Sequence, residues 1–254
     1  MTHILVDSVV APPEHAAEFS ESIVLLPPTF YVNDHMQYFR PEIRDAAAAA
    51  AAAGARFLVS NVSSRLQHGL PAAGTVVANF NQPYKMNAAS ARAACLALSL
   101  NEDAVWWASD GPAVYRTAVV AACRGVGVNS SRVKFSPPVG IIKFVERLGA
   151  ADVSAVRCSA PLPHPSNQLF IDTFPLGAHT VAMDSLALGT PVVAVAGTLY
   201  AHRVSASILA AAGAGAGGGV AARAPADCAT AGLNFLVARN GDDLYVVLLR
   251  DNIS

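Results

Sequence analysis

The chain has 254 residues, a formal net charge of −1 and a hydrophobic share of 53%. This length can hold a large domain with an ample core, and the balanced charge argues against a nucleic-acid partner, since binders of the phosphate backbone usually carry a basic stripe. Alanine inflates the hydrophobic share, and no apolar run reaches the roughly 20 residues that span a bilayer. Residues 1–20 also lack a secretory signal, so we expect a soluble, intracellular protein.

Strand-like and helix-like segments alternate along most of the chain. Residues 1–40 predict a strand, a short helix and a strand, and residues 41–71 combine an alanine-rich helix beginning at Pro41 with a polar stretch from Asn61 to Gly69. From about residue 72 the pattern is typical of a parallel sheet covered by helices. The predicted strands are Thr75–Asn79, Ala104–Ala108, Arg132–Phe135, Gln168–Asp172 and Pro191–Ala196, and the predicted helices are Ala88–Leu100, Pro112–Gly125, Ile141–Leu148, His179–Leu188 and Leu199–Ala212.

Two segments read as loops. Ala210 to Ala226 is of low complexity and predicts a flexible loop, and the Pro-rich stretch 154–167 predicts a surface insert. The Trp106-Trp107 pair lies inside a predicted strand, which favours a place in the core over a sugar-binding platform.

The cysteines and histidines give no sign of a metal site. The four cysteines are widely spaced and form no CxxC pair, so neither a zinc site nor a disulfide framework is expected, and Cys95 and Cys123 read as core thiols. The seven histidines are scattered, and we expect neither a metal nor a cofactor.

A candidate anion site lies where a predicted helix opens at His179-Thr180, directly after a strand and a turn. The free N–H groups and positive dipole end of such a helix face the carboxyl edge of the sheet, where phosphates bind. Asp184 follows one turn later on the same helix face and could reach ribose hydroxyls. The alternative is an ordinary helix capped by threonine. Lys85, just past a strand end, could partner a diphosphate, or it could be a solvated loop lysine.

Five strings in this chain resemble, in the same order, the C-terminal catalytic region of the O-linked N-acetylglucosamine transferases. This family glycosylates Ser and Thr of intracellular proteins. The strings are SESIVLLPPTFYVNDH (Ser20–His35), NFNQPYK (Asn79–Lys85), FSP (Phe135–Pro137), IDTFPLGAHTVAMDSLALGTP (Ile171–Pro191) and RVSASILAAAG (Arg203–Gly213).

The resemblance implies an α/β fold of the GT-B glycosyltransferase type. Residues 1–40 would end the N-terminal catalytic lobe, 41–71 would link the lobes, and 72–254 would form a C-terminal, Rossmann-like UDP-sugar lobe that is truncated at its end. Family members carry tetratricopeptide repeats and most of the N-terminal lobe ahead of this region. The expected location is the cytoplasm, the nucleus or both.

The resemblance also implies the reaction and its residues. The enzyme would transfer N-acetylglucosamine from UDP-GlcNAc to Ser/Thr hydroxyls of protein acceptors, without a metal. Lys85 would stabilise the departing β-phosphate, and Gln82, His179 and Thr180 would hold the diphosphate. Asp184 would bind ribose, and Arg147 would lie beside the uracil. The alternative is a truncated or degenerate, non-catalytic lobe that binds a UDP-sugar weakly or serves as an accessory surface.

Two positions depart from the family pattern. Val181 stands where the family has a second threonine facing the diphosphate, and Phe144 stands where it has a histidine near the uracil. Phe144 could stack on the base or belong to the helix core.

Overall fold

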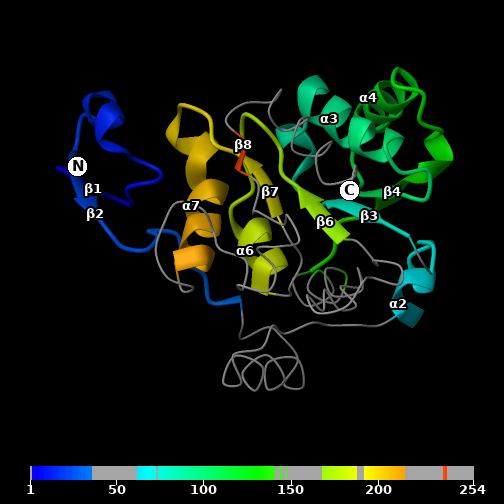
Figure 1. Cartoon of the computed structure of the whole chain (residues 1–254), viewed down its shortest axis with the longest axis horizontal. Helices are drawn as coiled ribbons and strands as arrows, with labels where there is room; N and C mark the ends of the chain where they lie inside the picture. The colour runs from blue at the N-terminus through cyan, green and yellow to red at the C-terminus, as the bar shows by residue number, and fades with distance from the viewer. Residues whose placement is uncertain are drawn as a thin grey trace.

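A six-stranded parallel sheet forms the centre of the protein (Figure 1). The computed structural model describes residues 2–35, 62–72, 74–140, 144, 147, 168–187, 192–214 and 237–238. The strands lie in the order β5-β4-β3-β6-β7-β8. They are β3 (Val76–Asn79), β4 (Val105–Ser109), β5 (Val133–Ser136), β6 (Gln168–Ile171), β7 (Val192–Val195) and β8 (Val237–Ala238).

The strand order reverses between β3 and β6. From β3 the chain builds outward through β4 to β5, then returns to place β6 on the other side of β3 and continues to β7 and β8, with every pair parallel. This is the order of a doubly wound, Rossmann-like sheet, in which ligands bind outside the carboxyl ends of the strands at the point of reversal. The fold therefore directs attention to the residues that follow β3 and β6.

Helices cover both faces of the sheet. The helices α3 (Ala88–Ser99) and α4 (Ala113–Arg124) pack on the face that carries Val77 and Trp106. The helices α6 (Thr180–Ala187) and α7 (Tyr200–Ala214) pack on the face that carries Val76 and Trp107. Strands buried on both faces form continuous apolar runs, and for this reason the alternation of strands and helices could be predicted from the sequence. Both tryptophans are 0% exposed, which confirms that the pair belongs to the core.

The first 35 residues form a separate unit beside α7 (Figure 1). The strands β1 (His3–Val6) and β2 (Ser22–Leu25) pair in parallel, and the 3-10 helix η1 (Pro13–Glu18) joins them. The predicted order of strand, short helix and strand is thus confirmed. Parallel sheets are normally covered on both faces, yet Leu5 is 58% and Leu25 is 52% exposed here.

Polar contacts attach this unit to α7. The Asp7 carboxylate accepts a hydrogen bond from Ser207 Oγ at 2.6 Å and another from the Phe30 amide at 3.0 Å. One turn earlier on α7, Arg203 Nε donates to the Val9 carbonyl at 2.6 Å. Asp7 and Ser207 are both buried, so these directed bonds fix the orientation of the unit more strictly than apolar packing would.

The observed elements differ from the predicted ones in two places. The polar stretch Asn61–Gly69 contains the helix α2 (Val62–Gln67). The helix α7 continues to Ala214, inside the predicted loop, because alanine favours helix more than any other residue. The remaining short elements are the 3-10 helices η3 (Pro83–Lys85) and η4 (Ser130–Arg132).

Several predictions fall on residues that are not described. They are the alanine-rich helix at Pro41, the insert 154–167 and the later part of the 210–226 loop, and of the predicted helix Ile141–Leu148 only Phe144 and Arg147 are described, both as helical. The division into the three domains 1–40, 41–71 and 72–254 stays a prediction. No helix in the described part of the chain is long and apolar enough to cross a membrane.

The expectation that Cys95 and Cys123 are free core thiols was wrong. Their sulfur atoms are bonded to each other and link α3 to α4 on one face of the sheet. Both residues are fully buried, as expected. The two cysteines are 28 residues apart, and so wide a spacing gives no local sign of pairing. Their contact follows from the packing of two neighbouring helices.

Replacing both cysteines (Cys95→Ala with Cys123→Ala) should lower the free energy of unfolding. The loop-closure model gives about 3–4 kcal/mol for a loop of this length. Urea unfolding without reductant measures the difference. A reductant should bring the unfolding midpoint of the wild type towards that of the variant and leave the variant unchanged. Equal midpoints for the two proteins without reductant would contradict a stabilising disulfide.

Candidate functional site

The polar residues that follow β3 and β6 meet at the point where the strand order reverses. Asn81, two residues past β3, donates from Nδ2 to Asp172 Oδ1 at 3.0 Å and to Thr173 Oγ1 at 2.9 Å. Asn79, the last residue of β3, donates to the Ile171 carbonyl at 2.7 Å. All of these side chains are buried. The two strand ends are therefore joined by side-chain bonds just beyond the backbone pairing.

Asp172 shapes the turn that leads from β6 to α6. Its Oδ1 accepts from the amides of Thr173 at 2.7 Å and Ala178 at 2.6 Å, and its Oδ2 accepts from Ser205 Oγ on α7 at 2.5 Å. Burial raises the pKa of Asp172, and these hydrogen bonds oppose that rise. A Cβ at Gly177 would lie 3.0 Å from Asp172 Oδ2, so a larger residue at that position would require the carboxylate to shift by a few tenths of an ångström.

Lys85 points at this turn. It ends the short helix η3, and its Nζ donates to the Gly177 carbonyl at 2.7 Å. Burial lowers the pKa of Lys85, and the negative charge of Asp172 partly offsets the effect. Gln82 is the residue before η3; its carbonyl accepts from the Lys85 amide at 2.9 Å, and the residue is exposed. The lysine predicted from sequence therefore lies at the turn before α6, and the glutamine lies next to it in the chain.

His179 and Thr180 stand at the start of α6, close to Lys85. Burial lowers the pKa of His179, and repulsion from the Lys85 charge lowers it further. His179 Nε2 is buried and has no hydrogen-bond partner in the described part of the chain. Thr180 Oγ1 lies 2.5 Å from Tyr31 Oη. The structure thus brings Lys85, His179 and Thr180 together at one helix start.

Asp184 lies one turn further along α6 and is 1% exposed. Its Oδ2 is 3.0 Å from His35 Nδ1, and its Oδ1 is 3.5 Å from Asn33 Nδ2. Burial raises the pKa of Asp184, and the bonds from His35 and Asn33 oppose the rise. The carboxylate is held by residues 29–35, a segment that we call the strap. Its contact with ribose stays a prediction.

Arg147 lies apart from this group, past the end of β5. Its Nη1 donates to the Pro137 carbonyl at 2.7 Å, and the residue is 8% exposed. Burial lowers the pKa of Arg147. Burial also lowers the pKa of His68, and the positive charge of Arg147 lowers it further. His68 in turn lies against Trp107, with ring centroids 4.9 Å apart. The place of Arg147 beside a base stays a prediction.

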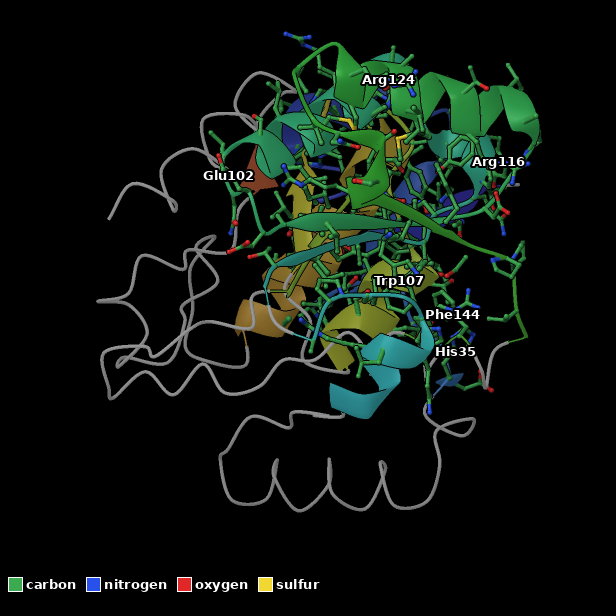
Figure 2. All side chains as sticks on the ribbon, turned by 90° about the vertical axis from the view of Figure 1, so that its right-hand side faces the viewer. His35, Glu102, Trp107, Arg116, Arg124 and Phe144 are labelled. Atoms are coloured by element: carbon green, nitrogen blue, oxygen red, sulfur yellow. A yellow bond between two sulfur atoms is a disulfide. The ribbon has the colours of Figure 1, made fainter. Side chains whose placement is uncertain are left out.

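Phe144 belongs to an aromatic cluster on the same side of the sheet. Its ring lies 6.0 Å from that of Phe80, which meets Trp107 edge to face at 4.9 Å. Figure 2 shows Trp107 and Phe144 on the side of the sheet opposite Arg116 and Arg124 of α4. Phe144 thus packs on the core, while its ring remains partly exposed.

Sequence reasoning missed several residues that shape the site. Asn81, Asp172 and Ser205 lie inside the strings that carried the family resemblance, as do Tyr31 and His35 of the strap, but none was assigned a role. The polar residues that directly follow the predicted strands were the feature of the sequence that could have indicated Asn81 and Asp172. Among the described residues, no group of three His, Cys, Asp or Glu side chains could hold a metal ion.

Comparison with known proteins identifies the family. The model of glycosyl transferase family 41 matches residues 42–223 of this chain. The chain belongs to glycosyl transferase family 41. This membership confirms the resemblance to the protein O-GlcNAc transferases and the prediction of a GT-B-type α/β fold.

Two curated relatives and one solved structure are similar to this family 41 chain. It is 25% identical over 211 residues to the probable UDP-N-acetylglucosamine–peptide N-acetylglucosaminyltransferase SEC of Arabidopsis thaliana, an alignment that covers 83% of the chain and 18% of that protein. It is 30% identical over 150 residues to the probable enzyme of the same description, SPINDLY, of Petunia hybrida, covering 56% of the chain and 13% of that protein. The chain therefore spans less than a fifth of the length of either relative.

The solved structure is a mutant O-GlcNAc transferase of Thermobaculum terrenum, which superposes with a TM-score of 0.64 at 16% identity. The superposition covers 100% of this chain and 38% of the Thermobaculum terrenum chain. At this identity the likeness shows the fold alone.

The closeness of Lys85 and His179 yields a test by titration. Replacing the lysine with an uncharged side chain of similar length (Lys85→Met) should raise the pKa of His179 towards 6.5, because the repulsion is removed. His202, whose pKa is lowered by burial alone, serves as the control and should not change. Ring signals followed by NMR across the pH range measure both values. An unchanged His179 pKa in Lys85→Met would contradict the contact.

The lowered pKa of His179 also sets the sign of its effect on stability. As the pH falls below about 6.5, the His179 imidazole binds a proton in the unfolded chain before it does so in the folded chain. The contribution of His179 to the free energy of unfolding is therefore present above that pH and lost as the pH falls through the folded pKa. Lys85→Met should make this loss smaller.

Proposed function

We propose that this chain supplies the UDP-GlcNAc-binding half of a protein O-GlcNAc transferase. The observation that carries the proposal is the convergence of Lys85, His179 and Thr180 at the start of α6, at the point where the strand order reverses. The free N–H groups of a helix start, a hydroxyl and an ammonium are the donors that a diphosphate needs. Membership of family 41 supports UDP-GlcNAc as the donor and Ser/Thr hydroxyls of proteins as acceptors.

In the proposed reaction the acceptor hydroxyl attacks the anomeric carbon directly. The bond from this carbon to the β-phosphate oxygen breaks, the configuration inverts, and UDP leaves with the bonding electron pair. Lys85 would stabilise the charge that develops on the departing phosphate, because a fixed cation in a partly desolvated site acts strongly on such charge. Helix N–H groups and hydroxyls would take the place of a metal ion, so we propose a reaction without a metal or cofactor.

The remaining site residues would bind the rest of the donor. Gln82 would join His179 and Thr180 at the diphosphate, Asp184 would bind ribose, and Arg147 would lie beside the uracil. The buried guanidinium of Arg147 has no carboxylate partner in the described part of the chain, which leaves its charge available to a polar ligand. The location that the family resemblance implies, and that we propose, is the cytoplasm, the nucleus or both.

Calorimetry with UDP tests the donor site. The wild-type chain should bind UDP, and Lys85→Ala should weaken binding roughly tenfold or more, because a hydrogen bond to a charged group contributes about 1.5–3 kcal/mol. His179→Ala with Thr180→Ala should also weaken it. Arg124→Ala is the control; it removes one positive charge from the exposed end of α4, far from the site (Figure 2). Equal affinities for wild type and Lys85→Ala would remove the lysine from the site.

A second test concerns transfer itself. We expect the 254-residue chain alone to transfer sugar poorly. Aligning the acceptor with the donor can supply about 7–11 kcal/mol of the barrier. The apolar face of β1 and β2 is exposed, so the surface that would align the acceptor lacks a covering segment there. The assay follows labelled GlcNAc from UDP-GlcNAc onto a Ser/Thr peptide, for this chain and for a longer polypeptide that covers β1 and β2. Light scattering should show self-association of the short chain. Robust turnover by the short chain would contradict this expectation, and UDP binding without transfer by the long polypeptide would favour a non-catalytic lobe.

A further inference from the structure

The strap, residues 29–35, crosses the start of α6 and contacts it at two levels. Tyr31 Oη lies 2.5 Å from Thr180 Oγ1, and one turn further on His35 Nδ1 lies 3.0 Å from Asp184 Oδ2. At its other end the strap is anchored by the Phe30 amide, which donates to the buried Asp7 carboxylate. The strap is therefore fastened on both sides of Tyr31, and its place over the helix start is fixed.

Packing fixes the direction of the Tyr31 ring as well. It meets the His179 ring edge to face, with centroids 5.6 Å apart, and meets Phe30 in the same manner at 6.1 Å. The phenol is part-buried and has few ways to turn away from Thr180. The contact between the two hydroxyls is thus imposed by the rings around it, and the phenolic oxygen is held in position before any ligand arrives.

Two hydroxyls that bond to each other have two protons, and only one of them lies between the oxygens. A phenol is a stronger hydrogen-bond donor than an aliphatic hydroxyl, so the favoured arrangement has Tyr31 donating to Thr180 Oγ1. The threonine proton is then free for another acceptor. Hydrogen bonds in such a chain polarise and strengthen one another. A phosphate oxygen at the start of α6 is an acceptor in the right place.

We infer that Tyr31 is a positioning residue for the donor diphosphate: it donates to Thr180 Oγ1 and thereby directs the threonine hydroxyl at a phosphate oxygen. This inference rests on the proposed function, because it takes the diphosphate to lie beside Thr180. It adds a contribution from the N-terminal unit of the chain to a site otherwise built by the strand ends of the six-stranded sheet. The strap then prepares the donor site as well as covering it.

The test compares UDP with uridine, which lacks the phosphates, on the full 254-residue chain. Tyr31→Phe removes only the phenolic oxygen and keeps the ring. We expect it to weaken UDP binding about fivefold, the effect of one hydrogen bond, and to leave uridine binding, followed by NMR titration, unchanged. Tyr200→Phe is the matched control: its ring also packs on Phe30, at 5.6 Å, and in the described part of the chain its hydroxyl forms no hydrogen bond with Thr180.

A double-mutant cycle separates positioning from packing. In a Thr180→Val background, Tyr31→Phe should have no further effect on UDP binding, because the phenol acts through the threonine hydroxyl. Equal losses for UDP and uridine, or full additivity in the cycle, would overturn the inference. If the wild type binds UDP and Tyr31→Phe binds it equally well, only the role of Tyr31 falls. If the wild type does not bind UDP, the proposed function falls and the inference falls with it.

Discussion

The site depends on one buried carboxylate, that of Asp172. It joins three parts of the fold that are distant in sequence: Asn81 after β3, the Ala178 amide at the start of α6, and Ser205 on α7. Burying a carboxylate costs folding free energy unless its oxygens accept hydrogen bonds, and here both oxygens accept them. The turn closed by these bonds presents the Gly177 carbonyl to Lys85 and sets where α6 begins. Without Asp172, neither the lysine nor the helix start would have a fixed place.

The helix α7 extends this arrangement to the first 35 residues of the chain. Ser205 faces Asp172, while Ser207, two residues later, faces Asp7 and lies 2.7 Å from Thr29 Oγ1. Each serine hydroxyl therefore meets a buried carboxylate from a different part of the fold. Hydrogen bonds are directional, so this helix fixes the angle of the N-terminal unit relative to the turn before α6. That angle in turn decides where the strap crosses the start of α6.

The order of strands and helices could be predicted from the sequence, because each central strand is buried on both faces and therefore forms one continuous apolar run. The family resemblance implied that Lys85, His179 and Thr180 share one diphosphate site, and the structure places all three at the start of α6. The strap was beyond such reasoning, because 149 residues separate Tyr31 from Thr180 and no local pattern marks the contact. The bond between Cys95 and Cys123 was missed for the same reason, as it depends on how two helices pack. The helix α7 extends beyond its predicted end because an alanine-rich sequence is compatible with both a helix and a low-complexity loop.

The two cationic side chains at the start of α6 would interact strongly with the diphosphate of the proposed function. Lys85 and His179 both have pKa values lowered by burial, so each positive charge is disfavoured in the free protein. Lys85 forms no ion pair among the described residues; its ammonium donates to the Gly177 carbonyl, which is neutral. A diphosphate placed there would reverse both shifts, since an adjacent anion favours the protonated forms. Binding would then favour the protonated form of His179, and by linkage the affinity for the diphosphate would rise as the pH falls towards the pKa of the free histidine. The burial that lowers these two pKa values would thus also strengthen the interaction of both side chains with an anionic ligand.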